Sequence, residues 1–202
     1  MSSYLIPAEN TVFEESIKSS RFVTYLAHCE NMDAARAFVN QIKEKHADAR
    51  HNCWAFAAGA PGDSNFFGCS DDGEPSGTAG KPMLAQLSGS NIGEIVAVTA
   101  RYFGGTKLGT GGLVKAYGGG VNQALKQLAT KHKVLTETLK FEVPFEWQNL
   151  FENTCQSLQV DVKERHYRNK IDITLSCPID NIEQLQQRLV HGSKGQIHPI
   201  LK

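Results

Sequence analysis

The beginning of the chain alternates between apolar and polar positions. Two such segments, residues 12–18 and 21–29, flank the polar pair Ser19-Ser20 and predict an antiparallel hairpin. After Asn31, which suits the capping position of a helix, apolar residues recur at helical spacing to about Lys45. This pattern predicts an amphipathic helix whose apolar stripe covers the sheet that the hairpin begins.

The middle of the chain predicts more strands of this sheet and two further helices. Residues 53–58 and 65–70 are strand candidates around a turn, and residues 94–101 form a nearly unbroken apolar run typical of a buried strand. Pro82 suits the first turn of one helix, and residues 112–129 carry the apolar spacing of another. Three consecutive glycines inside the second helix predict either close backbone packing or a local break.

The last third of the chain begins with a polar, basic segment. Residues 130–136 are the best candidate for a linker, which places a domain boundary near Val134, between residues 1–133 and residues 134–202. The remainder follows the order β-α-β-β-α-β, which is the order of a ferredoxin-like sandwich. We therefore expect an α+β protein of two small domains.

Composition narrows the possible classes of function. Lysine plus arginine and aspartate plus glutamate each total 21, so an anion-binding surface must be local rather than global. The chain shows no signal-peptide pattern at its start and no apolar run of the roughly 18 residues that a spanning helix needs. We expect a cytoplasmic protein without a membrane partner.

The five cysteines are scattered and include no Cys-x-x-Cys pair. Neither a disulfide framework nor a zinc knuckle is indicated, and we expect reduced, mostly buried thiols. His51 and Cys53 share a face of one predicted strand without necessarily touching, and no third group orients them as a nucleophile pair. The sequence therefore identifies no catalytic residue, no metal ligand and no established cofactor.

A glycine-rich segment, residues 101–112, joins the buried strand to a helix. Its N–H groups can converge, and the helix N-terminus adds partial positive charge, so a phosphate or carboxylate would be favoured there. Thr110 replaces the P-loop lysine and Val114 replaces the third glycine of GxGxxG, so neither nucleotide template fits. Alternatively, the glycines only permit a tight turn. The expected anion or RNA contacts are Arg101, Gly104, Gly105, Lys107, Gly109, Gly111, Gly112 and Lys115.

An acidic segment forms a second candidate site. Asp71, Asp72 and Glu74 place three carboxylates within four positions, before a flexible stretch that enters a helix. Such carboxylates could hold a hard cation such as Mg²⁺ or perform acid–base chemistry. The alternative is a solvated acidic turn followed by a capping sequence. Secondary candidates, at the hairpin tip and at the start of the helix, are Ser20, Arg21 and Lys81.

Three segments stand out together: KSSRF at residues 18–22, SDDGEPSGTAGKP at residues 70–82, and RYFGG followed by LG and GGLVKAY within residues 101–117. In order and spacing they resemble the YigZ/IMPACT family, and the likeness covers essentially the whole chain. The resemblance implies a bacterial two-domain member. Its N-terminal α/β domain would be similar to the second domain of a small-subunit ribosomal protein, and its C-terminal ferredoxin-like domain would be similar to a domain of elongation factor G.

The resemblance supplies no catalytic residues, and the regulatory role of eukaryotic relatives is not transferred with it. The leading hypothesis is a noncatalytic binding protein that contacts RNA, a ribosome or a translation-related protein, with translation regulation as its role. The alternative is a metal-assisted hydrolase acting on a phosphorylated or peptide-like substrate through the acidic residues, with Mg²⁺ as cofactor. A third hypothesis is a small-molecule sensor formed between the domains. The oligomeric state stays open.

Overall fold

The computed structural model describes residues 2–200, which fall into two compact units. One unit comprises Tyr4–Lys133, and the other comprises the chain from Val134 onward together with Ser2 and Ser3. Both units mix helices and strands, which confirms the expected α+β class. None of the helices in the described residues combines the length and apolar character that crossing a bilayer requires.

The N-terminal unit is built on a five-stranded antiparallel sheet with strand order β2-β3-β6-β4-β5. These strands are β2 (Thr11–Ile17), β3 (Ser20–His28), β4 (His51–Ala57), β5 (Phe67–Ser70) and β6 (Ile95–Tyr102). The hairpin of β2 and β3 confirms the prediction from the alternating segments. The central strand β6 is buried along almost its whole length, which explains its unbroken apolar run.

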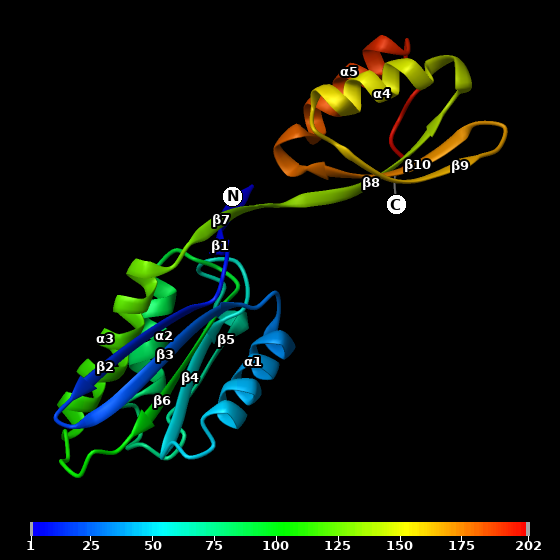
Figure 1. Ribbon diagram of the computed structural model, residues 1–202. Helices are drawn as coiled ribbons and strands as arrows, with labels where there is room; N and C mark the ends of the chain where they lie inside the picture. Colours follow the sequence, from blue (N-terminus) through cyan, green and yellow to red (C-terminus); the bar gives the residue numbers. More distant parts are fainter. Residues whose placement is uncertain (1, 201–202) are drawn as a thin grey trace. The chain divides into compact units, whose positions relative to one another are not determined.

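Helices cover both faces of this sheet (Figure 1). α1 (Met32–Lys45) packs on one face against β4 and β6, while α2 (Gly80–Gly89) and α3 (Thr110–Gln127) pack on the other. Asn31 caps α1 as predicted, because its side chain accepts the N–H of Ala34 at 2.8 Å. Each face of the sheet therefore has its own apolar core.

The three glycines of α3 do not break the helix. A Cβ on Gly120 would lie 2.9 Å from Oγ1 of Thr24 in β3, so the close packing predicted from the sequence is present at that position. A Cβ on Gly118 would make an ordinary contact with Pro82, and one on Gly119 would meet open space. Close packing is confirmed at Gly120, and the alternative of a local break is wrong.

The strand predicted over residues 65–70 is shorter in the structure. A 3₁₀ turn, η1 (Ser64–Phe66), occupies its beginning, and only Phe67–Ser70 pairs with β4. Asp63 stabilises the turn, since its side chain accepts the N–H of Asn65 at 3.1 Å. Local turn chemistry therefore overrides the strand pattern at the first positions.

The segment predicted as a linker contains the division between the two units, after Lys133, and most of it forms a strand. β7 (Thr130–Val134) pairs with β1 (Ser3–Pro7) in a two-stranded ribbon. At its ends, the N–H of Ala8 donates to the carbonyl of Ala129 and the N–H of Leu135 donates to the carbonyl of Ser2, both at 2.8 Å. The polar composition of residues 130–134 reflects an exposed strand, in which few side chains reach a core.

Glu94 fastens this ribbon to the five-stranded sheet. Its buried carboxylate accepts the hydroxyl of Tyr4 in β1 at 2.9 Å, lies 2.7 Å from Nε2 of His28 in β3, and pairs with Lys133 in β7. Burial alone would raise the pKa of Glu94, but its contacts with Lys133, His28 and Tyr4 hold that pKa below its usual value. One carboxylate thus connects three strands.

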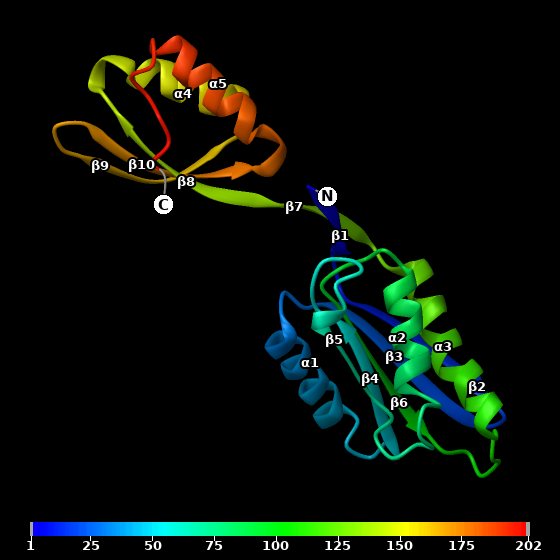
Figure 2. The same ribbon diagram turned by 180° about the vertical axis from the view of Figure 1, so that it is seen from behind.

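The C-terminal unit is a three-stranded antiparallel sheet, in the order β8-β10-β9, with two helices on one face (Figure 2). Its elements are β8 (Thr136–Val143), η2 (Phe145–Trp147), α4 (Gln148–Ser157), β9 (Asp161–Tyr167), β10 (Ile171–Pro178), η3 (Ile179–Asn181) and α5 (Ile182–Gly192). The predicted last strand is reduced to a bridge between Phe141 and Pro199. Proline has no N–H to donate, so a regular ladder cannot continue through it.

Candidate functional site

Two loops of the N-terminal unit meet beside the end of the sheet. The acidic loop, residues 71–79, leads from β5 into α2, and the glycine loop, residues 103–109, leads from β6 into α3. Between them lies a pocket of about 450 Å³, the loop pocket. Its polar floor comprises His51, Glu74 and Arg101, its apolar wall comprises Pro75, Phe103, Leu108 and Leu113, and its basic rim comprises Arg50 and Lys107.

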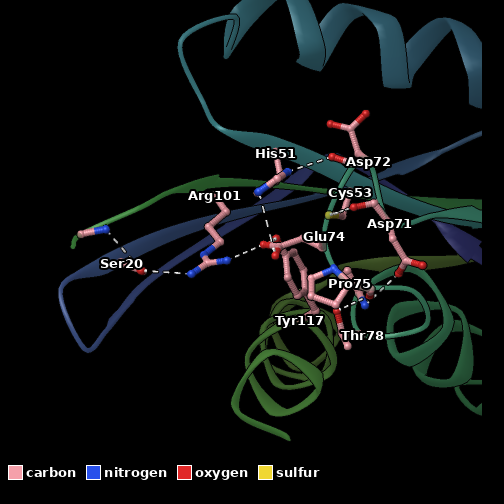
Figure 3. A network of polar contacts seen from close by, with 12 residues as sticks. Ser20, His51, Cys53, Asp71, Asp72, Glu74, Pro75, Thr78, Arg101 and Tyr117 are labelled. Carbon is pink, nitrogen blue, oxygen red and sulfur yellow. Dashed lines mark hydrogen bonds and ion pairs between the residues drawn. The ribbon is translucent and has the colours of Figure 1, made fainter. Parts of the chain in front are cut away.

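The floor is organised by a buried ion pair. Nη1 of Arg101 donates to Oε1 of Glu74 at 2.5 Å, and both side chains are at least nine-tenths buried. The hydroxyl of Tyr117 in α3 donates to the same oxygen at 2.8 Å (Figure 3). Burial, together with the nearby Cys53 and Glu74, raises the pKa of Tyr117, so its hydroxyl remains a donor. The pair joins the acidic loop to β6 and α3.

Arg101 also connects the floor to the hairpin of β2 and β3. Its Nη2 lies 3.5 Å from Oγ of Ser20, and its guanidinium lies 5.5 Å and 5.7 Å from the ring centroids of Phe22 and Phe103. Its buried Nε has no hydrogen-bond partner among residues 2–200. Ser20 in turn accepts the N–H of Gly104 at 3.3 Å. Ser20 therefore anchors the glycine loop from a fully buried position.

His51 presents one ring nitrogen to the floor. Its Nδ1 lies 2.8 Å from the carbonyl oxygen of Asp72, which can only accept, so Nδ1 carries a proton. Its Nε2 lies 4.0 Å from Oε2 of Glu74. Cys53 faces elsewhere: its thiol donates to the carbonyl of Asp71 at 3.0 Å, and burial raises its pKa to about 12. The geometry therefore gives no nucleophile pair of His51 and Cys53.

The carboxylates of Asp71 and Asp72 are used within the fold. Asp71 accepts the backbone N–H groups of Gly77, Ala79 and Gly80 at 2.7 to 2.9 Å. Asp72 accepts Nζ of Lys43 and the N–H of Asn52, both at 2.7 Å, and Figure 3 shows its carboxylate directed away from Glu74. Burial would raise the pKa of each aspartate, but these donors hold both pKa values below the usual range.

The three carboxylates predicted as one acidic site therefore do not converge. Only Glu74 lines the loop pocket, and Arg101 already pairs with it. Within residues 2–200, the side chains of histidine, cysteine, aspartate and glutamate form no group of three or more that could hold a metal ion. Mg²⁺ prefers several oxygen ligands at one point, and the acidic loop does not provide that arrangement.

The rim provides exposed positive charge. Arg50 and Lys107 are exposed, and neither pairs with a carboxylate in the described part of the chain. Gly109, at a left-handed φ of 74°, precedes Thr110, the first residue of α3, and both line the pocket. The first N–H groups of a helix lack partners within it, so the start of α3 adds partial positive charge beside Lys107.

The other predicted residues lie away from the loop pocket. Lys81 and Lys115 line a shallow groove between α2 and α3 instead. Arg21 is exposed on β3 and pairs with Glu14 through two hydrogen bonds. A Cβ on Gly104 would lie 1.8 Å from the carbonyl oxygen of Ser19, so this glycine permits close approach of the hairpin. The remaining predicted glycines outside the lining are Gly105, Gly111 and Gly112.

The predicted site residues did not include Arg50, Phe103 or Tyr117, although the last two lie within the motifs of residues 101–117. Arg50 immediately precedes β4, and the pairing of His51 with Arg101 in the β4–β6 register brings it to the pocket. Phe103 directly follows Tyr102, the last residue of β6, and an exposed aromatic after a buried strand is a usable signal. Tyr117 is hidden among the apolar positions of α3, so only its hydroxyl group hinted at a polar role.

Known proteins match both units. The model of the Impact N-terminal domain matches residues 18–125, and that of a domain of unknown function (DUF1949) matches residues 141–196. An IMPACT family member of Haemophilus influenzae is 47% identical over 197 residues, which cover 98% of this chain and 96% of the relative. The IMPACT family member YigZ of Escherichia coli is 48% identical over 199 residues, which cover 98% and 97%.

A solved structure agrees with these relatives. The chain in the crystal structure of a hypothetical protein is 45% identical in sequence to this chain and superimposes on it with a TM-score of 0.77. The match covers 100% of this chain and 98% of that chain. The sequence motifs, both domain matches and these near full-length relatives agree, and the chain belongs to the IMPACT family.

Proposed function

We propose that this protein is a noncatalytic binding protein that holds phosphate groups of RNA in the translation machinery at the rim of the loop pocket. The observation that carries the proposal is the contrast in charge across the pocket. Glu74 on the floor is neutralised by Arg101, whereas Arg50, Lys107 and the start of α3 are open at the rim. An anion entering the pocket therefore meets uncompensated positive charge.

Local charge is the relevant quantity because the whole chain is neutral. Two cations and a helix N-terminus can contact a small number of phosphates, which favours a specific RNA feature over coating of a long duplex. The ribosome is the first partner to test, because the family resemblance relates both domains to domains of the translation machinery. The hydrolase alternative has no comparable support, since Asp71 and Asp72 are saturated by donors of the fold.

The test is co-sedimentation of the purified protein with ribosomes at increasing salt. Wild type is compared with Arg50→Ala/Lys107→Ala and with the control Arg36→Ala/Lys126→Ala, which removes two exposed cations outside the pocket. We expect salt-sensitive binding that only the first variant loses, because counterion release supplies phosphate affinity. Absence of wild-type binding, or equal loss in both variants, would contradict the proposal. Arg101 is unsuitable here, since removing it leaves Glu74 buried without its partner.

A further inference from the structure

We infer that the loop pocket takes one unstacked nucleotide of single-stranded RNA, with the base inside the pocket and its phosphate at the rim. The inference rests on the proposed function, because it names the kind of RNA that the same site binds. Three features of the pocket support it: its concave shape, its apolar wall and the free hydrogen-bonding groups of its floor.

The shape of the site suits a single nucleotide better than a duplex. A volume of about 450 Å³ lies within the range of roughly 300 to 1,000 Å³ that small-molecule pockets occupy. A double helix keeps its bases paired inside and offers mainly sugar and phosphate to a protein. It would therefore reach Arg50 and Lys107 at the rim and leave the wall and floor unused.

The wall offers an aromatic surface beside apolar side chains. Phe103 is 40% exposed, and Leu108, Leu113 and Pro75 line the same pocket. The guanidinium of Arg50 lies 5.6 Å from the ring centroid of Phe103, so a planar cationic group already packs at this ring. RNA-binding proteins stack unpaired bases on aromatic rings and on arginine planes. Phe103 and Arg50 together provide both surfaces.

The floor offers groups for the edge of a base. Because Nδ1 of His51 donates to the carbonyl of Asp72, Nε2 is the ring nitrogen left for the pocket, and it lies 4.0 Å from Oε2 of Glu74. The buried Nε of Arg101, in the same lining, lacks an acceptor within residues 2–200. An exocyclic amine such as that of adenine can donate to Oε2 of Glu74, since Arg101 and Tyr117 both donate to Oε1. The floor therefore favours a base over a bare phosphate.

The experiment measures fluorescence anisotropy of labelled oligoadenylate, alone and annealed to oligouridylate. Phe103→Leu removes the aromatic face but keeps an apolar side chain, Phe103→Trp keeps stacking, and Phe145→Leu is the control at an exposed phenylalanine of the other unit. We expect the affinity for single strands to be at least about ten-fold higher than that for duplex. Phe103→Leu should lower the affinity for single strands about ten-fold and leave the affinity for duplex unchanged. Phe103→Trp and Phe145→Leu should bind like wild type, and thermal unfolding confirms that each variant folds.

The outcomes separate this inference from the proposed function. Duplex binding as tight as single-strand binding or tighter, or an unchanged single-strand affinity in Phe103→Leu, overturns the inference of an unstacked nucleotide. The proposed function would still be supported if Arg50→Ala/Lys107→Ala lost salt-sensitive ribosome binding. Failure of wild type to bind either oligonucleotide also overturns the inference. Unchanged ribosome binding in Arg50→Ala/Lys107→Ala counts against the proposed function, whatever the oligonucleotides show.

Discussion

The acidic loop and the glycine loop are both polar and rich in glycine, yet the structure uses them in opposite ways. The acidic loop places its charges inward: Asp71 binds three backbone N–H groups, and Glu74 pairs with Arg101. The glycine loop leaves Lys107 exposed at the start of α3. The difference teaches that a dense run of charges indicates a binding site only where the fold leaves those charges without partners.

The largest test of this contrast is to remove the partner of Glu74. Arg101→Met leaves a buried carboxylate whose one remaining hydrogen-bond donor within residues 2–200 is Tyr117, and we expect a loss of about 3–5 kcal/mol in the free energy of unfolding, measured by urea denaturation. The double variant Arg101→Met/Glu74→Gln should recover much of that loss, since no uncompensated charge remains. A single variant within about 1 kcal/mol of wild type would show that the pair is not needed.

A smaller effect is expected at Asp71. Asp71→Asn keeps the size of the side chain but removes the charge that holds Gly77, Ala79 and Gly80, and we expect a loss of about 2 kcal/mol. The matched change Asp63→Asn, at a carboxylate that accepts one N–H in an exposed turn, should cost less. Denaturation curves of both variants check the order. Equal losses would mean that the acidic loop does not depend on Asp71.

The same contacts predict a stability that falls in acid. The folded pKa values of Asp71, Asp72 and Glu94 are lowered from the usual 3.8 and 4.5, so the unfolded chain takes up protons first as the pH falls. Their contribution is complete above the unfolded values and is lost progressively below roughly pH 4.5. Denaturation between neutral and acidic pH should show this decline, and Asp71→Asn should make it shallower. If the free energy of unfolding of the variant fell as steeply with pH as that of wild type, Asp71 would not contribute to the acid sensitivity.

The smallest change in stability is expected from substitutions at the rim of the loop pocket. Arg50→Ala/Lys107→Ala should alter the free energy of unfolding by no more than about 0.5 kcal/mol per site, because both side chains are exposed and have no carboxylate partner among the described residues. Thermal unfolding checks this expectation. If the double variant lost as much as Asp71→Asn, the rim cations would be structural and the contrast between the loops would disappear.

Local patterns of the sequence predicted most elements of the fold. The alternating hairpin, the Asn31 cap and the buried run of β6 follow from spacing within a few residues. The predictions failed where a distant partner or a turn decided the outcome. Residues 130–134 contain the division between the units, but their strand forms because β1 pairs with them; residues 64–66 form a turn because Asp63 caps it.

The candidate site was less predictable because it depends on strand order. Ile95, Ala97 and Thr99 lie on the face of β6 that α2 and α3 cover, and a period of two continues that face to Arg101. This pattern could have shown that Arg101 is buried and needs a carboxylate, rather than contacting phosphate at the surface. Only the pairing of β4 with β6 identifies the neighbours that surround it, and no local pattern encodes that pairing.

The ribbon of β1 and β7 has a further consequence for the architecture of the chain. The chain enters the N-terminal unit through β1 and leaves it through β7. Because these strands lie side by side and Glu94 binds both, the two ends of the unit are adjacent. Folded modules with adjacent ends tolerate insertion into a host loop or attachment to a new neighbour. The unit that carries the loop pocket is therefore suited to fusion with other domains, with the segment beyond β7 exchanged and the pocket itself unchanged.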